Sequence, residues 1–141
     1  MELPVHDLFR NKEIVRAFWL APPHKKASYL TDDSTWHLPT SIGQRQFGRC
    51  DLQGEEARGI FTQAAADVFE PGGSIDILHL VAEDDLVSLH CQVHSRLKGG
   101  IEYQGAYHML FRLEGESIAE TWELLDTAYQ AQCLASPTRT D

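Results

Sequence analysis

The sequence predicts an α+β fold, in which helices come first along the chain and an antiparallel sheet follows. Two observations lead to this prediction. Apolar residues recur with helical spacing in the segments up to residue 69, and they alternate with polar residues from Ser74 onward. Connectors of three or four residues separate the alternating segments, so neighbouring strands can form hairpins but cannot make the long crossover that parallel pairing needs.

Three helices are expected in the first half of the chain. The first ends before Pro22-Pro23, because proline interrupts a helix, and its apolar stripe consists of Leu8, Val15, Phe18 and Trp19. A short second helix is expected at about residues 24–30. The third runs from Gly54 to Phe69, because acidic residues follow its start and Pro71-Gly72-Gly73 stops it.

The remaining elements are strands and loops. A brief strand is expected at residues 35–39, and three glycines among polar residues predict a loop over 40–54. The alternating segments predict strands at about 75–82, 86–97, 102–113 and 118–126. We therefore expect a single domain over residues 1–141, with its core at about 6–130 and a loose C-terminal tail at 131–141.

Charge and composition exclude several classes of protein. The 141 residues carry a net charge of −9, which disfavours nucleic acid and anionic membrane surfaces as partners. No apolar run is long enough to span a bilayer, and the start has no secretory signal pattern. The cysteines Cys50, Cys91 and Cys133 form no Cys-x-x-Cys pair, so a reduced, cytoplasmic protein is expected.

Several short phrases, in their order and spacing, indicate a known family. They are Trp36-His-Leu-Pro39, Gly54-Glu-Glu-Ala57, and the segments 78–87, 111–115 and 118–126. Over about residues 6–130 the chain resembles the nuclear transport factor 2-like (ketosteroid isomerase-like) superfamily and, within it, the SnoaL-like proteins. The resemblance implies a cone-shaped α+β barrel, with three N-terminal helices packed on a curved, mostly antiparallel sheet and a pocket at the open end. It also implies a homodimer.

The resemblance carries catalytic residues only in part. Known activities in the superfamily include ketosteroid isomerisation, aldol cyclisation, dehydration and epoxide opening. The isomerases' catalytic aspartate corresponds here to Leu38, and an acid of the limonene-epoxide hydrolases corresponds to Leu124. The arginine and aspartate of those hydrolases fall near Cys91 and Val93. Asp126, in contrast, matches the acid that SnoaL-type cyclases use for acid/base chemistry.

A candidate site follows from an assumed strand register. Two-residue turns at Glu83-Asp84 and Gly99-Gly100, with Leu113 opposite Ile118, would place most candidates on one sheet face. The catalytic candidates are Asp126, His94 and Tyr107, and the ligand-binding candidates are Trp36, His79, His90, Tyr103, Met109 and Trp122. A slip of one residue would reverse the facing of a strand. Both Trp36 and Trp122 can equally be core residues.

The chemistry of this set suits proton transfer. Loss of water around Asp126, between Trp122 and Tyr107, would favour its neutral acid. Such a carboxyl could move a proton at a carbon next to a carbonyl, while a histidine or tyrosine stabilises the oxyanion. His37 is a substitute base in this scheme. The structural alternative for Asp126 is that it caps the end of the sheet by accepting a hydrogen bond from a backbone amide.

The sequence thus leads to two functional hypotheses. In the first, the chain is an isomerase, cyclase or dehydratase that acts on a small, largely apolar carbonyl compound without a cofactor. In the second, it is a non-catalytic ligand-binding or dimerisation module. No metal site is expected, because His90 and His94, four residues apart on one strand, are about 13 Å apart.

Overall fold

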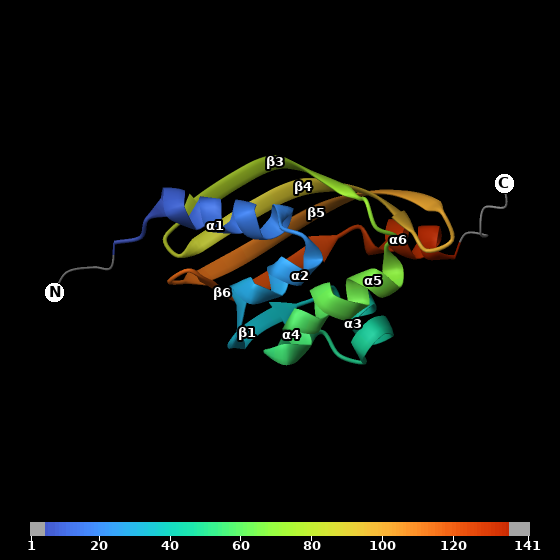
Figure 1. Cartoon of the computed structure of the whole chain (residues 1–141), viewed down its shortest axis with the longest axis horizontal. Helices are drawn as coiled ribbons and strands as arrows, with labels where there is room; N and C mark the ends of the chain where they lie inside the picture. The colour runs from blue at the N-terminus through green and yellow to red at the C-terminus, as the bar shows by residue number, and fades with distance from the viewer. Residues whose placement is uncertain (1–4, 136–141) are drawn as a thin grey trace.

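The computed structural model describes residues 5–135 and confirms the α+β fold. Its sheet has six strands in the order β2-β1-β6-β5-β4-β3, and the helices cover one face of this curved sheet (Figure 1). All neighbouring strands are antiparallel except β1 and β6. The strands are β1 (Leu30–His37), β2 (Asp51–Gln53), β3 (Ser74–Glu83), β4 (Leu86–Leu97), β5 (Ile101–Glu114) and β6 (Ser117–Leu125).

The three expected helices are confirmed. The first is α1 (Leu8–Leu20), and its first turn is capped by Asp7, whose side chain accepts a hydrogen bond from the Arg10 amide. The second is α2 (Pro23–Lys26), followed by a 3₁₀ turn at Ala27–Tyr29. The third consists of α4 (Glu55–Gly59), a π-helical turn (Ile60–Ala64) and α5 (Ala65–Val68).

The expected loop at residues 40–54 is wrong, because the segment contains α3 (Thr40–Phe47) and β2. Gly43 and Gly48 are required by the packing and the end of α3 rather than by a loop. A Cβ on Gly43 would lie 2.7 Å from the carbonyl oxygen of Arg49, so only glycine fits there. Gly48 ends α3 with a φ of 74°, the left-handed conformation that glycine adopts at low cost.

The tail is ordered further than expected. Helix α6 (Thr127–Leu134) occupies the first four residues of the segment predicted to be loose, because Asp126 accepts a hydrogen bond from the Tyr129 amide and caps it. The remainder of the predicted tail, from residue 136, lies outside the described residues.

Three register details decide which side chains face the helices. The β4–β5 connector has three residues, since Leu97 pairs with Ile101, so the assumed two-residue turn is wrong by one position. The first hairpin is also shifted, because Glu83 pairs with Leu86. Leu113 does pair with Ile118, but a bulge at Ala119 then shifts the rest of β6 by one residue.

The shifted register divides the predicted face between the two sides of the sheet. The side toward the helices, here called the inner face, carries Tyr103, Tyr107, Met109 and Glu123. The opposite, outer face carries His79, His90, His94 and Trp122.

An aromatic cluster forms the core between α1 and the inner face. Phe18 of α1 lies 5.5–6.0 Å from the ring centroids of Phe61, Phe111 and Trp36, and all four are buried. Burial of such rings is the main stabilising contribution of this interface. No helix within residues 5–135 is long and apolar enough to cross a membrane, and the three cysteines are free.

Candidate functional site

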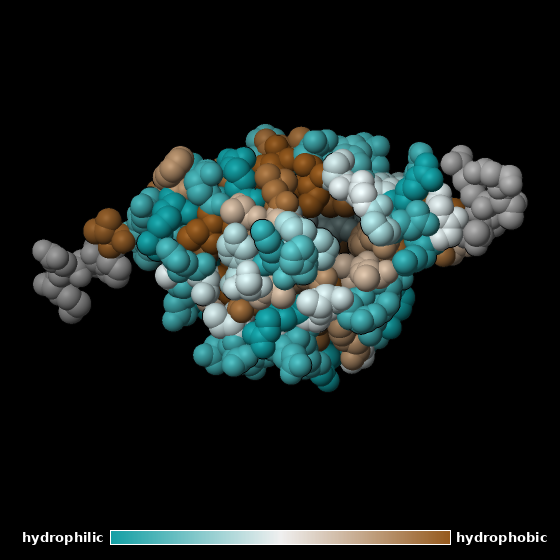
Figure 2. All heavy atoms as spheres, viewed as in Figure 1, coloured by the Kyte–Doolittle hydropathy of each residue, from teal (hydrophilic) through white to brown (hydrophobic). Residues whose placement is uncertain are grey.

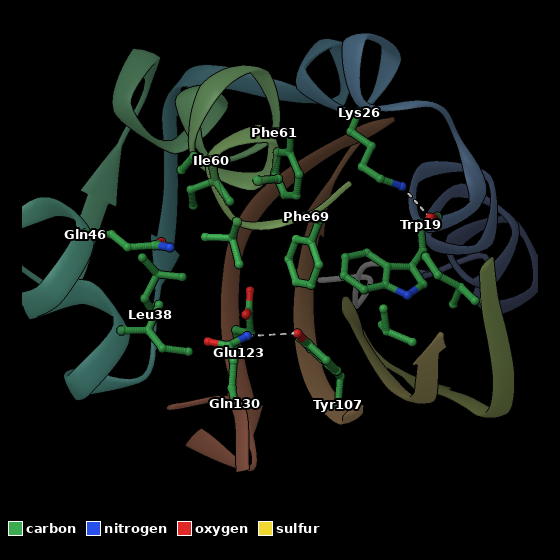
Figure 3. Close-up of a pocket in the computed structure, with 16 residues that line it drawn as sticks. Trp19, Lys26, Leu38, Gln46, Ile60, Phe61, Phe69, Tyr107, Glu123 and Gln130 are labelled. Atoms are coloured by element: carbon green, nitrogen blue, oxygen red, sulfur yellow. Dashed lines mark hydrogen bonds between the residues drawn. The ribbon is translucent and has the colours of Figure 1, made fainter. Parts of the chain in front are cut away.

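A cavity of about 200 Å³ lies between the helices and the inner face of the sheet. In the surface view a hollow opens between α2 and α5 (Figure 2). Most of the lining is apolar, which suits a small, largely apolar ligand. The polar or ionisable side chains in the lining are Lys26, Gln46, Tyr107, Glu123 and Gln130 (Figure 3).

Glu123 is the acid of the cavity. The bulge at Ala119 turns it toward the helices, and its Oε1 accepts a hydrogen bond of 2.9 Å from Nε1 of Trp36. Burial among apolar side chains raises the pKa of the Glu123 carboxyl to about 7, while the hydrogen bond from Trp36 acts in the opposite direction. The carboxyl therefore changes its protonation state near neutral pH.

Tyr103, Tyr107 and Gln130 form a hydrogen-bonded cluster, and the last two of these side chains lie beside Glu123 in Figure 3. The hydroxyl oxygens of Tyr103 and Tyr107 are 3.1 Å apart, and Nε2 of Gln130 donates to both at 3.4 Å. Arg45 donates to Oε1 of Gln130 at 3.3 Å and so fixes the amide orientation. Of the two hydroxyl hydrogens, only one can lie between the tyrosines, so Tyr107 can donate the other to a molecule in the cavity.

Both tyrosines remain protonated donors. Burial raises the pKa of Tyr103, and it raises the pKa of Tyr107 well above the usual value. A neutral hydroxyl next to a half-buried carboxyl can donate to an oxygen on which negative charge develops.

Lys26, from α2, lies at another part of the cavity wall. Its Nζ donates to the backbone carbonyl oxygens of Phe18, at 3.1 Å, and Trp19. The Nζ atom also lies 5.2 Å from the ring centroid of Trp19. Burial lowers the pKa of Lys26 to about 8.

Four of the sequence-predicted site residues lie on or near the cavity side. Tyr107 lines the cavity, and Tyr103 is hydrogen-bonded behind it. Trp36 is a core residue that also donates to Glu123. Met109 is buried on the inner face, outside the cavity lining.

The histidine candidates and Trp122 lie on the outer face. His79 and His90 stack with Nδ1 atoms 3.1 Å apart, and Nε2 of His94 is 3.0 Å from Oδ2 of Asp76. Trp122 stacks on His37 at 5.3 Å. None of these residues lines the cavity.

Asp126 is exposed and caps α6. It accepts a hydrogen bond from a backbone amide, as expected for a structural rather than a catalytic role. His37, the substitute base, lies between Oδ1 of Asp51 at 2.7 Å and Oε2 of Glu120 at 2.6 Å. Neither residue is part of the cavity wall. Within residues 5–135, no three His, Cys, Asp or Glu side chains are grouped as metal ligands.

Glu123, Gln130 and Lys26 are not among the site residues predicted from the sequence. One signal for Glu123 was present, because a shift of one residue in β6 exchanges the facing of Trp122 and Glu123. Gln130 and Lys26 reach the cavity from short helices, and no residue spacing on the sheet indicates them.

Similarity to known proteins comes from structure alone. No protein-family model matches the sequence, and no curated protein matches it. A protein of unknown function from Burkholderia pseudomallei, described as NTF2-like, is 14% identical with a TM-score of 0.74, over 90% of this chain and 98% of its own.

Two further neighbours have a named activity. IdmH, a proposed polyketide cyclase from Streptomyces antibioticus, is 17% identical with a TM-score of 0.69, over 93% of this chain and 100% of its own. An epoxide hydrolase from M. tuberculosis is 14% identical with a TM-score of 0.68, over 92% of each chain. These likenesses show that the chain has the nuclear transport factor 2-like fold, which hosts more than one chemistry.

Proposed function

We propose that the cavity binds a small, largely apolar carbonyl compound and that Glu123 moves a proton at the carbon next to the carbonyl. The observation that carries this proposal is the position of the Glu123 carboxyl. It lies on an apolar cavity wall, is held by Trp36, and has its pKa raised to about 7. Isomerisation, cyclisation and dehydration of carbonyl compounds all use such a proton transfer.

The side chains supply both parts of this chemistry. The Glu123 carboxylate accepts the proton, and the resulting acid returns it at a second carbon or to a leaving hydroxyl group. When Tyr103 donates to Tyr107, the hydroxyl hydrogen of Tyr107 is available to the carbonyl oxygen, where negative charge develops. The cyclase assignment of the neighbour IdmH supports this reaction class, since polyketide cyclisation starts from an enolisable carbonyl compound.

The experiment compares two acids near the end of β6. A thermal-shift screen of enolisable ketones and aldehydes first identifies a compound that stabilises the protein, and its turnover is then followed by proton exchange in heavy water. Glu123→Gln keeps the shape of the side chain and lowers the exchange rate by about a hundredfold or more. The same variant retains binding within a few-fold.

Asp126→Asn is the matched control, because asparagine caps a helix as well as aspartate does while it removes the acid. We expect exchange at the wild-type rate in this variant. The opposite result, loss of exchange in Asp126→Asn with a normal rate in Glu123→Gln, transfers the role to the acid that the sequence indicates.

A binding module without catalysis is the second candidate function, and the largely apolar cavity lining favours it. In that case a ligand raises the melting temperature, but neither the wild type nor Glu123→Gln accelerates exchange. The two hypotheses therefore predict different rates of proton exchange and the same affinity for the ligand.

A homodimer remains a prediction, and the apolar side chains of the outer face support it. Leu124 is 65% exposed and Trp122 is 36% exposed on β6, so a second copy could cover them. Sedimentation velocity of the wild type and of Leu124→Glu measures this directly. A dimer through the outer face is expected to dissociate in the variant.

A further inference from the structure

Lys26 is the one lysine of the described residues that lines the cavity, and the proton-transfer scheme does not use it. Its side chain is 9% exposed, whereas the adjacent Lys25 is exposed to solvent. The close-up shows Lys26 reaching from α2 toward Trp19 at the cavity wall (Figure 3). Burial of a lysine on an apolar wall is unusual without a carboxylate partner.

The contacts of Nζ account for two hydrogens. Its partners are the carbonyl oxygens of Phe18 and Trp19, and no carboxylate in residues 5–135 forms an ion pair with it. A neutral amine has two N–H bonds, which match these two acceptors, and one lone pair. Hydrogen bonding to both carbonyls thus leaves the lone pair free, and Lys26 is one of the residues that line the cavity.

We propose that Lys26 is a nucleophile that forms an imine with the carbonyl group of a molecule bound in the cavity. This inference rests on the proposed function only in that the ligand carries a carbonyl group. One electrostatic observation supports it in addition to the contacts of Nζ. Burial lowers the pKa of Lys26 to about 8, so the amine is about half neutral near that pH, and desolvated lysines of this kind are nucleophiles toward carbonyls.

The reaction is balanced without an oxidant or a reductant. The Nζ lone pair forms a bond to the carbonyl carbon, while the C=O π electrons move to oxygen, which takes up a proton. The nitrogen loses two protons in all, and the hydroxyl group takes up the second proton and leaves as water. The products are one C=N bond and one water molecule.

A non-covalent anion site is the competing use of the same lysine. The charge of the chain, −9, disfavours an anionic ligand at long range. The apolar wall around Nζ also favours a neutral carbonyl compound over a carboxylate.

Reductive trapping tests the proposal. The full-length protein is incubated with benzaldehyde and sodium cyanoborohydride, which reduces an imine to a stable secondary amine, and the modified peptide is identified by mass spectrometry. Benzaldehyde has no hydrogen on the carbon next to its carbonyl, so proton abstraction by Glu123 plays no part. Failure of this test and failure of the proposed function are therefore distinguishable.

We expect one benzyl group per chain, on Lys26 rather than on Lys12, Lys25 or Lys98. Lys26→Arg keeps donors for the two carbonyls but cannot form the imine, and its labelling falls at least tenfold. Lys25→Arg, the adjacent exposed control, is labelled as the wild type is. Glu123→Gln is also labelled at Lys26.

Two outcomes overturn the proposal. One is labelling spread evenly over the four lysines, which requires only the wild type and so does not depend on the folding of a variant. The other is binding of benzoate that Lys26→Gln abolishes and Lys26→Arg retains, without any trapped benzaldehyde adduct, which identifies an anion site instead.

Discussion

Ionisable side chains have different surroundings on the two faces of the sheet. On the inner face, Glu123 lies on an apolar wall and its one described hydrogen-bond donor is the neutral indole of Trp36. On the outer face, His37 lies between the carboxylates of Asp51 and Glu120, and His94 pairs with Asp76. The outer groups have charged partners, whereas the inner group is half-buried and forms no ion pair within the described residues.

The physical cause of the pKa shift differs accordingly. Desolvation dominates at Glu123 and raises the pKa of its carboxyl. At His37, partial desolvation lowers the pKa, but hydrogen bonds and attraction to Asp51 and Glu120 outweigh it and raise the pKa. The pKa therefore rises by desolvation on the inner face and by charged partners on the outer face.

The largest expected effect concerns the stability of the inner face as a function of pH. The folded-state pKa of Glu123, about 7, lies above its unfolded value of 4.5, so the folded state retains a proton that the unfolded state loses. The free energy of unfolding from this group therefore decreases as pH rises from about 4.5 to 7, by on the order of 3 kcal/mol. Below pH 4.5 this cost is absent.

Urea unfolding of the wild type and of Glu123→Gln at several pH values measures it. The difference in the free energy of unfolding between the two proteins removes the contributions of the other titrating groups. We expect this difference to favour the variant increasingly up to about pH 7 and then to become constant. A difference that does not vary with pH would show that the carboxyl is hydrated like the outer groups.

The comparison of the two faces also shows where sequence reasoning succeeds. Alternation with period two located all four strands from Ser74 to Leu125 within about two residues, because residue spacing reports directly on strand geometry. Pro22-Pro23 ended α1 as expected. The glycines of residues 40–54 did not predict the local structure correctly. Close packing at Gly43 and the end of a helix at Gly48 require glycine as much as a loop does.

The candidate site depended on facing, which the sequence does not determine. One extra residue in the β4–β5 connector separates the β4 histidines from the β5 tyrosines, and the bulge at Ala119 exchanges Trp122 for Glu123. Both are single-residue details that leave the alternation intact. Tyr107 was chosen and lines the cavity, whereas Glu123 needed three-dimensional information.

An intermediate effect tests whether Asp126 belongs to the structure of α6 or to the chemistry. Asp126→Ala removes the acceptor for the Tyr129 amide, at 3.0 Å, and is expected to lower the free energy of unfolding by about 1 kcal/mol. Asp7→Ala, which removes the equivalent 2.9 Å contact of α1, is the matched control and should cost a similar amount. Thermal unfolding measures both variants.

A larger loss in Asp126→Ala than in Asp7→Ala would have a specific meaning. Helix α6 carries Gln130, which donates to Tyr103 and Tyr107. Extra destabilisation would then show that the cap also supports the hydrogen bonds behind the cavity. Equal losses would restrict Asp126 to the end of its helix.

The smallest expected effect is on the outer face. His90→Ala removes the stack with His79, whose ring lies at 5.3 Å, but both rings contact solvent. The free energy of unfolding should change by no more than about 0.5 kcal/mol, with ligand binding unaffected.

Leu89→Ala is the matched control, because Leu89 is the adjacent residue of β4, faces inward and is fully buried. It should lower the free energy of unfolding by about 2–5 kcal/mol in the same urea titration. A large effect of His90→Ala in the monomer would contradict the division between the two faces. The same effect found only at concentrations where the protein is dimeric would instead indicate that a second copy covers the histidines.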